Sequence, residues 1–545
     1  MKKLIKNINK SILAIFGILL FVLVGCNNED EFLNRIPLDK PNPENFFVDA
    51  TSARAAVNAA FRPLTVSAHM FRRDLVLCLD AMTDDSYWRP ARAHSIALGN
   101  WDVTPTNENI NNYWQECYRS INAANFAIER IPTSSDPQFT TEKQLPYIAE
   151  ARFIRAWSYI FLTSLYGDVP LHLIASIESK PRSSRADILV QVVADLEFAG
   201  QNLLASPIED GVPTAAAAYG YLAKVYLWLG ENEKAITAAR SGVVSAEGAG
   251  FGLVDDYLSI WEEEQNKELL FYLPFATNDD TYGQNMTVQR LIRDIPTKLR
   301  TIEPGDGWGY GLPQLDLYNA FEPTDPRREF TMYAHGDNYG VYNGSEDFVY
   351  TYNTFDALGN EISETVTYQP GDLVTYNHNW SPTGFNIRKM TRSMFHLANV
   401  RWSGQDIPLM RMSELYLILA EALAEQGDAE ALIYVNKVRS RASVNMPEKT
   451  VADGNLVDLV RHERRVELAM EGIRIFDLIR WGTLADVFGN GTKVKRHYHS
   501  DLLPTSNITK FDSPVHDLTH LEGLLPIPQV EMDQNNEITT QNAGY

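Results

Sequence analysis

The chain is long and acidic, and both properties limit what it can be. Its 545 residues include 70 Asp and Glu against 48 Lys and Arg, which gives a formal charge of −22 at pH 7. This balance argues against nucleic acid or an anionic membrane surface as a partner. The length is ample for a large core, built either as one repeat-based unit or as two to three lobes.

The N-terminus has the pattern of an export signal. Lysines within residues 1–10 precede an apolar run from Ile12 to Val24, which is too short for a convincing membrane span. The run ends at Leu-Val-Gly-Cys26, which resembles the lipobox of bacterial lipoproteins, whose cysteine is acylated and becomes the first residue. We therefore expect a signal peptide over 1–25 and a lipid anchor on Cys26, followed by a tether over 26–44. An uncleaved anchor helix is the alternative.

The stretch Ala149–Pro170 predicts the central helix of the molecule. Its charges lie only at the start, and from Ala156 to Gly167 the pattern is apolar on every side. Such a helix should enter the middle of a helical array, with Gly167 and Pro170 ending it. Helical periodicity also covers residues 45–79, 110–131, 185–247, 409–442 and 456–481.

Two segments repeat a helix–turn–helix pattern. The first, within 185–247, turns at Gly230-Glu231-Asn232, and the second, Leu409–Ala442, turns at Gly427-Asp428. Their spacing resembles a tetratricopeptide unit, with a period of about 34 residues. Such units bury their apolar faces only by stacking on neighbours. We therefore predict a mainly α fold with a tetratricopeptide-like scaffold over 45–250 and 402–482.

Two other regions lack this periodicity. Residues 251–401 are rich in Gly, Asp, Asn, Tyr and Trp, and Phe348–Tyr352 alternates like a strand. We interpret residues 251–401 as an inserted, loop-rich lobe with short strands, of the kind that carries binding groups. Residues 483–545 are irregular, and Pro526 and Pro528 argue against a helix there. This last segment should pack over the scaffold.

Four segments together resemble the SusD/RagB family of outer-membrane nutrient-binding lipoproteins. They are the lipobox at Cys26, AEARFIRAWSYIFLTSLYGDVPL, VRHERRVELAMEGIRIFDLIRWG and LLPIPQVEMDQN, and their order covers essentially the whole chain. The resemblance implies about four helix pairs with a variable lobe that presents the ligand site. It also implies a SusC-like, TonB-dependent transporter as partner and an oligosaccharide, or in some members a peptide, as ligand. Asn-Asn-Glu-Asp-Glu after Cys26 resembles signals that send lipoproteins to the cell surface.

Two loops carry the side chains that grip sugars. An aromatic ring stacks on the C–H face of a sugar for about 1 kcal/mol, while carboxylates, amides and Arg bind its hydroxyls. The loop over 80–109 offers Asp84, Asp85, Tyr87, Trp88, Arg89, Arg92, Trp101 and Asn107, and the glycine-rich run 305–311 offers Trp308 and Tyr310. Family members place such residues in comparable regions. The alternative is that Trp88 and Trp101 pack the loop onto helices; Trp380 and Trp402 are interpreted as structural.

No motif in the chain indicates catalysis, a cofactor or a metal. The charge run Arg461–Glu471 is interpreted as ion pairs between helices, and Val466 breaks the H-E-x-x-H zinc motif. The glycines of 305–311 lack the strand and helix of a dinucleotide site. His497, His499, His516 and His520 lack ligand spacing. Cys78 and Cys117 should be buried thiols, with a disulfide between them as the alternative.

These patterns lead to one hypothesis and two alternatives. The chain is expected to be a lipid-anchored, non-enzymatic protein of the outer membrane that faces the cell surface. It would capture an oligosaccharide and deliver it to the SusC-like transporter. A peptide-capturing member of the family, or a protein-interaction scaffold without a small ligand, are the alternatives. The sequence does not define which glycan is bound.

Overall fold

The computed structural model describes residues 49–89, 91–207, 209–263, 265–276, 296, 298–299, 307–355, 360–391, 403–488, 494–496, 513–515 and 523–545. Cys26 with its leader and tether, Trp402 and the four histidines of the tail lie outside these residues. Within them, no helix combines the length and the apolar character that a membrane span requires.

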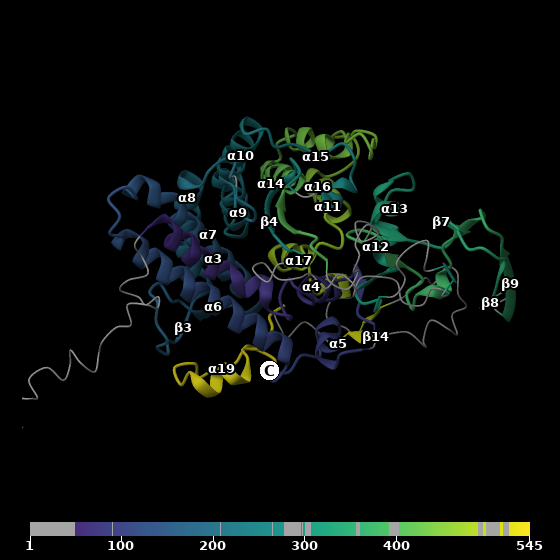
Figure 1. Ribbon diagram of the computed structural model, residues 1–545, viewed down its shortest axis with the longest axis horizontal. Coiled ribbons are helices and arrows are strands. Elements are labelled where there is room, and N and C mark those ends of the chain that lie inside the picture. The colour runs from purple at the N-terminus through teal and green to yellow at the C-terminus, as the bar shows by residue number, and fades with distance from the viewer. Residues whose placement is uncertain are drawn as a thin grey trace, which may run out of the picture.

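Helices stacked in chain order form the scaffold. Each helix of the first part packs on the next: α3 (Ala50–Val66), α6 (Glu108–Arg130), α7 (Thr141–Tyr166), α8 (Arg185–Asn202), α9 (Ala215–Trp228) and α10 (Asn232–Gly248). The stack then continues from α10 to α14 (Met412–Ala424), which packs on α15 (Ala431–Arg439) and α16 (Leu456–Glu467). Figure 1 shows α10 beside α14 and α15, although more than 150 residues separate them in sequence. The predicted tetratricopeptide-like, mainly α fold is confirmed.

Helix α7 lies at the centre, as its sequence predicts. Phe153, Trp157 and Phe161 are all buried, and the last two rings stack with centroids 5.6 Å apart. The helix ends at Gly167, whose φ of 76° is unfavourable for a residue with a side chain. The turn within the first repeat is also as predicted, with Gly230 at φ 71° between α9 and α10.

Several helix boundaries differ from the prediction. The pattern over 45–79 covers two helices, α3 and α4 (Leu75–Ala81), and the pattern over 456–481 covers α16 and α17 (Arg474–Trp481). Gly472 separates the latter pair, because its φ of 75° lies in the left-handed region and cannot continue a right-handed helix. The loop over 80–109 contains a further helix, α5 (Ala93–Gly99). The exclusion of helix near the C-terminus was wrong: α19 (Gln529–Gln534) begins directly after Pro528, which needs no N–H there.

The region between α10 and α14 holds short helices and paired strands, as predicted for the lobe. Its helices are α11 (Ser259–Glu262), α12 (Leu315–Ala320) and α13 (Arg327–Thr331). The strands pair antiparallel two by two: β4 (Leu269–Leu273) with β12 (Ile407–Arg411), β6 (Met332–Tyr333) with β11 (Asn386–Ile387), β7 (Asn338–Val341) with β10 (Leu373–Thr375), and β8 (Phe348–Phe355) with β9 (Glu361–Tyr368). The strand expected at Phe348–Tyr352 is confirmed as part of β8. The β8–β9 hairpin lies at the end of the molecule opposite α8 (Figure 1).

Three smaller strand pairs and the C-terminal segment complete the fold. β1 (Ser86–Tyr87) pairs with β5 (Leu312–Pro313), β2 (Val169–Pro170) with β3 (Arg182–Ser183), and β13 (Val494–Arg496) with β14 (Ser513–Val515). The C-terminal segment packs on α7: the Leu525 N–H donates to the Leu165 carbonyl over 2.7 Å, and the Asn542 side chain donates to the Tyr166 carbonyl over 2.8 Å.

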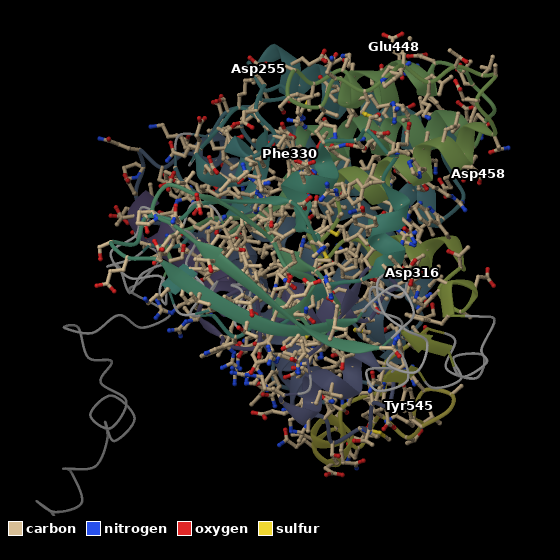
Figure 2. All side chains as sticks on the ribbon, turned by 90° about the vertical axis from the view of Figure 1, so that its right-hand side faces the viewer. Asp255, Asp316, Phe330, Glu448, Asp458 and Tyr545 are labelled. Carbon is tan, nitrogen blue, oxygen red and sulfur yellow. The ribbon has the colours of Figure 1, made fainter. Side chains whose placement is uncertain are left out.

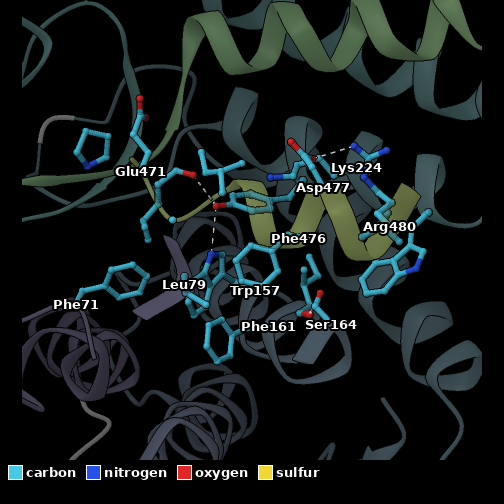
Figure 3. Close-up of a pocket in the computed structure, with 18 residues that line it drawn as sticks. Phe71, Leu79, Trp157, Phe161, Ser164, Lys224, Glu471, Phe476, Asp477 and Arg480 are labelled. Atoms are coloured by element: carbon cyan, nitrogen blue, oxygen red, sulfur yellow. Dashed lines mark hydrogen bonds and ion pairs between the residues drawn. The ribbon is translucent and has the colours of Figure 1, made fainter. Parts of the chain in front are cut away.

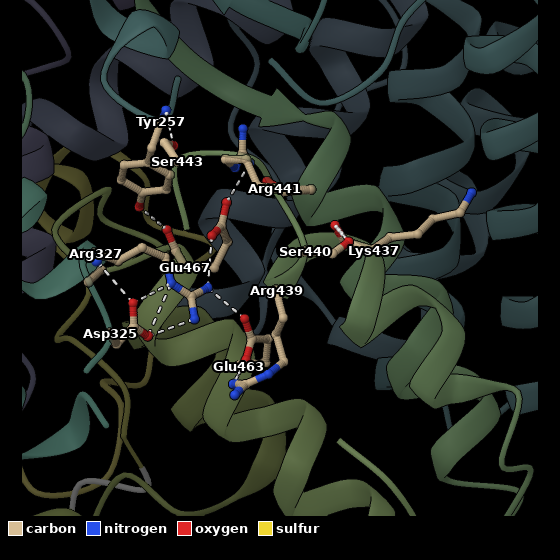
Figure 4. Close-up of polar contacts among 12 residues, drawn as sticks. Tyr257, Asp325, Arg327, Lys437, Arg439, Ser440, Arg441, Ser443, Glu463 and Glu467 are labelled. Carbon is tan, nitrogen blue, oxygen red and sulfur yellow. Dashed lines mark hydrogen bonds and ion pairs between the residues drawn. The ribbon is translucent and has the colours of Figure 1, made fainter. Parts of the chain in front are cut away.

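A buried network of ions joins the lobe to the scaffold (Figure 4). Glu463 and Glu467 of α16 both accept from Arg327 of the lobe, at 2.5 and 3.0 Å. The same two carboxylates also bind Arg439, Arg441 and Arg411. The interpretation of the Arg461–Glu471 run as ion pairs between elements is therefore confirmed.

Both described cysteines are buried and free. Cys78 lies on α4 and Cys117 on α6, and neither forms a disulfide. The prediction that Cys78 and Cys117 are buried thiols is confirmed, and the alternative of a disulfide between them is wrong. Burial raises the pKa of the Cys78 thiol to about 12, with Asp74 adding to the shift.

Candidate functional site

The two loops that the sequence singles out meet in space. Strand β1 in the first pairs with β5 directly after the second, with Ser86 opposite Pro313 and Tyr87 opposite Leu312. The Gln314 N–H also donates to the Asp85 carbonyl over 3.0 Å. This pairing joins segments more than 200 residues apart and forms one surface from both candidate loops.

Aromatic rings from both loops gather at this junction. Trp88 stacks on Tyr310 with ring centroids 5.1 Å apart and planes inclined by 14°, and Trp308 lies 6.0 Å from Tyr310 at 55°. The Arg92 guanidinium carbon lies 5.6 Å from the Trp308 ring centroid and 6.0 Å from that of Tyr310. These distances allow cation–π contacts. We call Trp88, Trp308, Tyr310 and Arg92 the aromatic platform.

Members of the platform differ in how much surface they offer. Trp88 is 3% exposed and Tyr310 is 8% exposed, whereas Trp308 is only partly buried. The Arg92 side chain is 33% exposed and lies 3.4 Å from Asp74. The Trp88 indole N–H donates to the Ala91 carbonyl over 2.7 Å, which fixes that ring. Trp88 and Tyr310 are therefore buried, which for Trp88 matches the alternative that it packs the loop onto the helices, whereas Trp308 and Arg92 keep part of their surface accessible.

Asp84 and Asp85 form ion pairs with arginines of the scaffold. Arg474 binds both oxygens of Asp84, at 2.6 and 2.8 Å, and Arg465 binds Asp85 at 2.7 Å. Burial tends to raise the pKa of Asp84, but Arg465 and Arg474 outweigh it and the pKa is lowered. These ion pairs hold the loop against α16 and α17.

The other predicted residues of the first loop have structural contacts. Trp101 is 1% exposed and its indole N–H donates to the Met82 carbonyl over 3.0 Å, so it packs the loop onto the helices, the alternative left open above. Asn107 is the N-cap of α6 and accepts from the Asn109 N–H over 2.9 Å. Tyr87 and Arg89 are both partly exposed beside the platform. A ligand-binding role for these four residues remains a prediction.

A separate groove lies between α7, α9 and α17 (Figure 3). Rings of Trp157, Phe161 and Phe476 line it, with Lys224 and Arg480 at its polar end. Those cations already bind Glu414 at 2.7 Å and Glu421 at 2.6 Å. The space is about 90 Å³, well below the roughly 300–1,000 Å³ of small-molecule sites. We assign the groove to packing of the scaffold.

The described residues include no group of three or more His, Cys, Asp or Glu side chains placed to hold a metal ion. Trp380, interpreted above as structural, is 1% exposed in the lobe.

The fold and the platform define a class: a tetratricopeptide-like scaffold whose inserted lobe and α4–α5 loop present aromatic rings. The chain belongs to the SusD family, whose profile matches residues 267–545. A second profile, described as starch-binding associating with the outer membrane, matches residues 40–227.

Individual relatives agree with this membership. The chain is 28% identical to SusD-like protein P2 of Formosa agariphila, over 97% of this chain and 99% of that protein. It is 35% identical to the starch-binding protein SusD of Bacteroides thetaiotaomicron, over 21% of each chain. A SusD-like carbohydrate binding protein of Bacteroides fragilis has the same fold, with a TM-score of 0.72 at 24% identity, covering 90% of this chain and 99% of that one.

Proposed function

We propose that the chain captures an oligosaccharide at the cell surface and delivers it to a SusC-like, TonB-dependent outer-membrane transporter. The observation that carries the proposal is the aromatic platform, in which pairing of β1 with β5 brings Trp308 and Arg92 together above two supporting rings. A partly exposed indole beside a guanidinium suits a sugar, because the ring takes the C–H face and the cation binds hydroxyl or carboxylate oxygens. The starch-binding description of the N-terminal profile supports the same ligand class.

We infer binding without chemical turnover. A glycosidase requires two carboxyl groups about 5–10 Å apart, one of which is protonated to act as an acid. The carboxyls nearest to Trp88 in sequence are Asp84 and Asp85, which form ion pairs with Arg474 and Arg465. The lowered pKa of Asp84 is opposite to what a general acid needs.

The lipid anchor is part of the proposal. Acylation at Cys26 would hold the protein at the outer membrane, with the scaffold and platform outside the cell. A Cys26→Ser variant should be released from the membrane fraction, whereas surface labelling of intact cells should detect the original chain. Recovery of the Cys26→Ser variant entirely in the membrane would contradict the anchor.

Binding is tested with a glycan panel and matched variants. Trp308→Ala should weaken binding about tenfold in isothermal titration, because it removes the most accessible ring of the platform. Tyr318→Ala is the control, since Tyr318 is an aromatic residue that is 36% exposed on α12 and not part of the platform. Equal affinity of both variants would refute the platform.

The same panel separates the alternatives. Arg92→Ala should reduce binding most for uronic-acid or sulfated glycans, since the guanidinium then loses an anionic partner. A peptide mixture retained by the protein while every glycan fails would favour the peptide-capturing alternative. Co-purification of the transporter with a protein that binds neither would favour the scaffold.

A further inference from the structure

A second pocket lies in the lobe, where the β8–β9 hairpin meets the β7–β10 ribbon. Its volume is about 490 Å³, within the roughly 300–1,000 Å³ of small-molecule sites and far above the groove in Figure 3. Its lining includes His335, Tyr352, Tyr368, Asp372, Tyr376 and Asn377. Figure 2 looks onto this end of the molecule, where the long hairpin crosses the near face.

One wall of this lobe pocket is aromatic. Phe348, Tyr350 and Tyr352 alternate along β8 and so share one face of the strand. Their rings stack in sequence, with centroids 6.3 Å apart for the first pair and 5.3 Å for the second. Tyr352 is the last ring of this ladder and is only partly buried at the pocket. Its hydroxyl donates to Glu364 over 2.6 Å, which holds the ring in place.

The opposite wall carries neutral and acidic polar groups. His335 Nδ1 lies 3.2 Å from His378 Nδ1. Burial lowers the pKa of His335 although Glu364 and Asp337 act against it, so the ring is neutral at pH 7 and can both donate and accept. Asp372 is partly exposed and accepts from the Gln369 N–H over 2.7 Å.

The charges of the lining select the ligand. Among the described residues that line the lobe pocket, none is Lys or Arg, and Asp372 is acidic. A carboxylate or sulfate would therefore meet repulsion and no counter-ion. The aromatic platform is different, because Arg92 faces it. A neutral polyhydroxylated unit satisfies this lining, with its C–H face on Tyr352 and its hydroxyls on His335, Asp372 and Asn377.

We propose that the lobe pocket is a second sugar-binding site, separate from the platform and selective for neutral sugar units. This inference takes from the proposed function only the class of ligand, which is a glycan. Two weak sites on one chain retain a long polysaccharide more firmly than either does alone, because the second contact becomes intramolecular.

The test uses the full mature chain and variants that act on one site at a time. Trp308→Ala disables the platform, and Tyr352→Ala removes the ring of the lobe pocket. Thr375→Trp fills the pocket from an exposed position and keeps the existing contacts. Thr351→Ala is the control, since Thr351 lies on the outer face of the same strand. The probes are maltohexaose, laminarihexaose, cellohexaose and xylohexaose, with trigalacturonic acid as the anionic probe, followed by ligand-observed NMR and titration calorimetry.

The expected result is that Trp308→Ala still binds at least one neutral probe and does not bind trigalacturonic acid. Adding Tyr352→Ala or Thr375→Trp should weaken that remaining binding about tenfold, and adding Thr351→Ala should not change it. The second site is refuted if the Trp308→Ala protein binds none of the neutral probes, or if both pocket variants leave its affinity unchanged. Should Trp308→Ala bind as tightly as the original chain, the platform fails, and Tyr352→Ala and Thr375→Trp in the original chain still decide on the lobe pocket.

Discussion

Replacing Glu467 by Gln should strongly destabilise the protein, because this carboxylate balances three buried cations. Glu467 is 0% exposed, and its oxygens lie at ion-pair distance from Arg411 at 2.6 Å, Arg441 at 3.0 Å and Arg327 at 3.0 Å. The Gln side chain keeps the shape and removes the charge, which leaves buried guanidinium groups with too few counter-ions. Removing one partner of a buried ion pair costs about 3–5 kcal/mol.

The assay is urea unfolding followed by tryptophan fluorescence. With an m-value of about 3 kcal/mol/M, a loss of about 3–5 kcal/mol lowers the midpoint by about 1.0–1.7 M. Glu448→Gln is the control, because Glu448 is exposed, and its effect should stay within about 0.5 kcal/mol. A midpoint of Glu467→Gln within about 0.3 M of the original would refute the reasoning.

The same pair of proteins gives a dependence on pH. Burial alone would raise the pKa of Glu467, but Arg411, Arg441 and Arg327 lower it well below its ordinary value of 4.5. A carboxyl with a lowered folded-state pKa contributes stability above its unfolded pKa and loses it as the pH falls toward the folded value. The stability difference between original and variant should thus be constant from pH 7 to about 5 and shrink below 4.5. A difference that grows on acidification would contradict this sign.

Three further changes test the core and the support of the platform. Trp157→Ala should cost about 3–5 kcal/mol, because it empties the centre of α7, and thermal unfolding would measure the loss. Cys78 and Cys117 should react with a thiol reagent only after urea unfolds the chain; rapid labelling of the native protein would contradict their burial. Gly311→Ala should cost about 1–3 kcal/mol, since φ is 65° and the new Cβ would come within 2.7 Å of Leu77; unchanged stability and glycan affinity would contradict that packing.

Periodicity predicts the scaffold because each helix shows its apolar face in its own sequence. This holds for α7. The turns at Gly230 and Gly427 are likewise marked locally, by a glycine between two helical patterns. The break between α16 and α17 does not show in the apolar periodicity, since it depends on the left-handed backbone of the single residue Gly472. Helix α19 was missed because proline excludes a helix only at interior positions, whereas Pro528 lies directly before the helix, where it is tolerated.

The candidate site was predictable only in composition. Trp88, Trp308 and Tyr310 are recognisable as ring-bearing loop residues, but β1 and β5 are two residues long each and leave no periodic signal of their pairing. Trp88 and Trp101 are both buried, and their indole N–H groups donate to the carbonyls of Ala91 and Met82. The pairing of β1 with β5 and the burial of the tryptophan rings both depend on contacts between residues far apart along the chain.

The β4–β12 ribbon has a consequence for how specificity can change in this architecture. Leu273 lies opposite Ile407, so the chain leaves the stacked helices and returns to them at one narrow neck, the β4–β12 ribbon. An insert of a different length can replace the present one while α10 and α14 stay in register. Among other contacts, the replacement must supply basic groups equivalent to Arg327 and Lys389, because carboxylates of α16 and the following turn would otherwise be buried without counter-ions. The ligand specificity of the lobe can therefore change between proteins of this fold, provided that the β4–β12 ribbon and the two buried cations are retained.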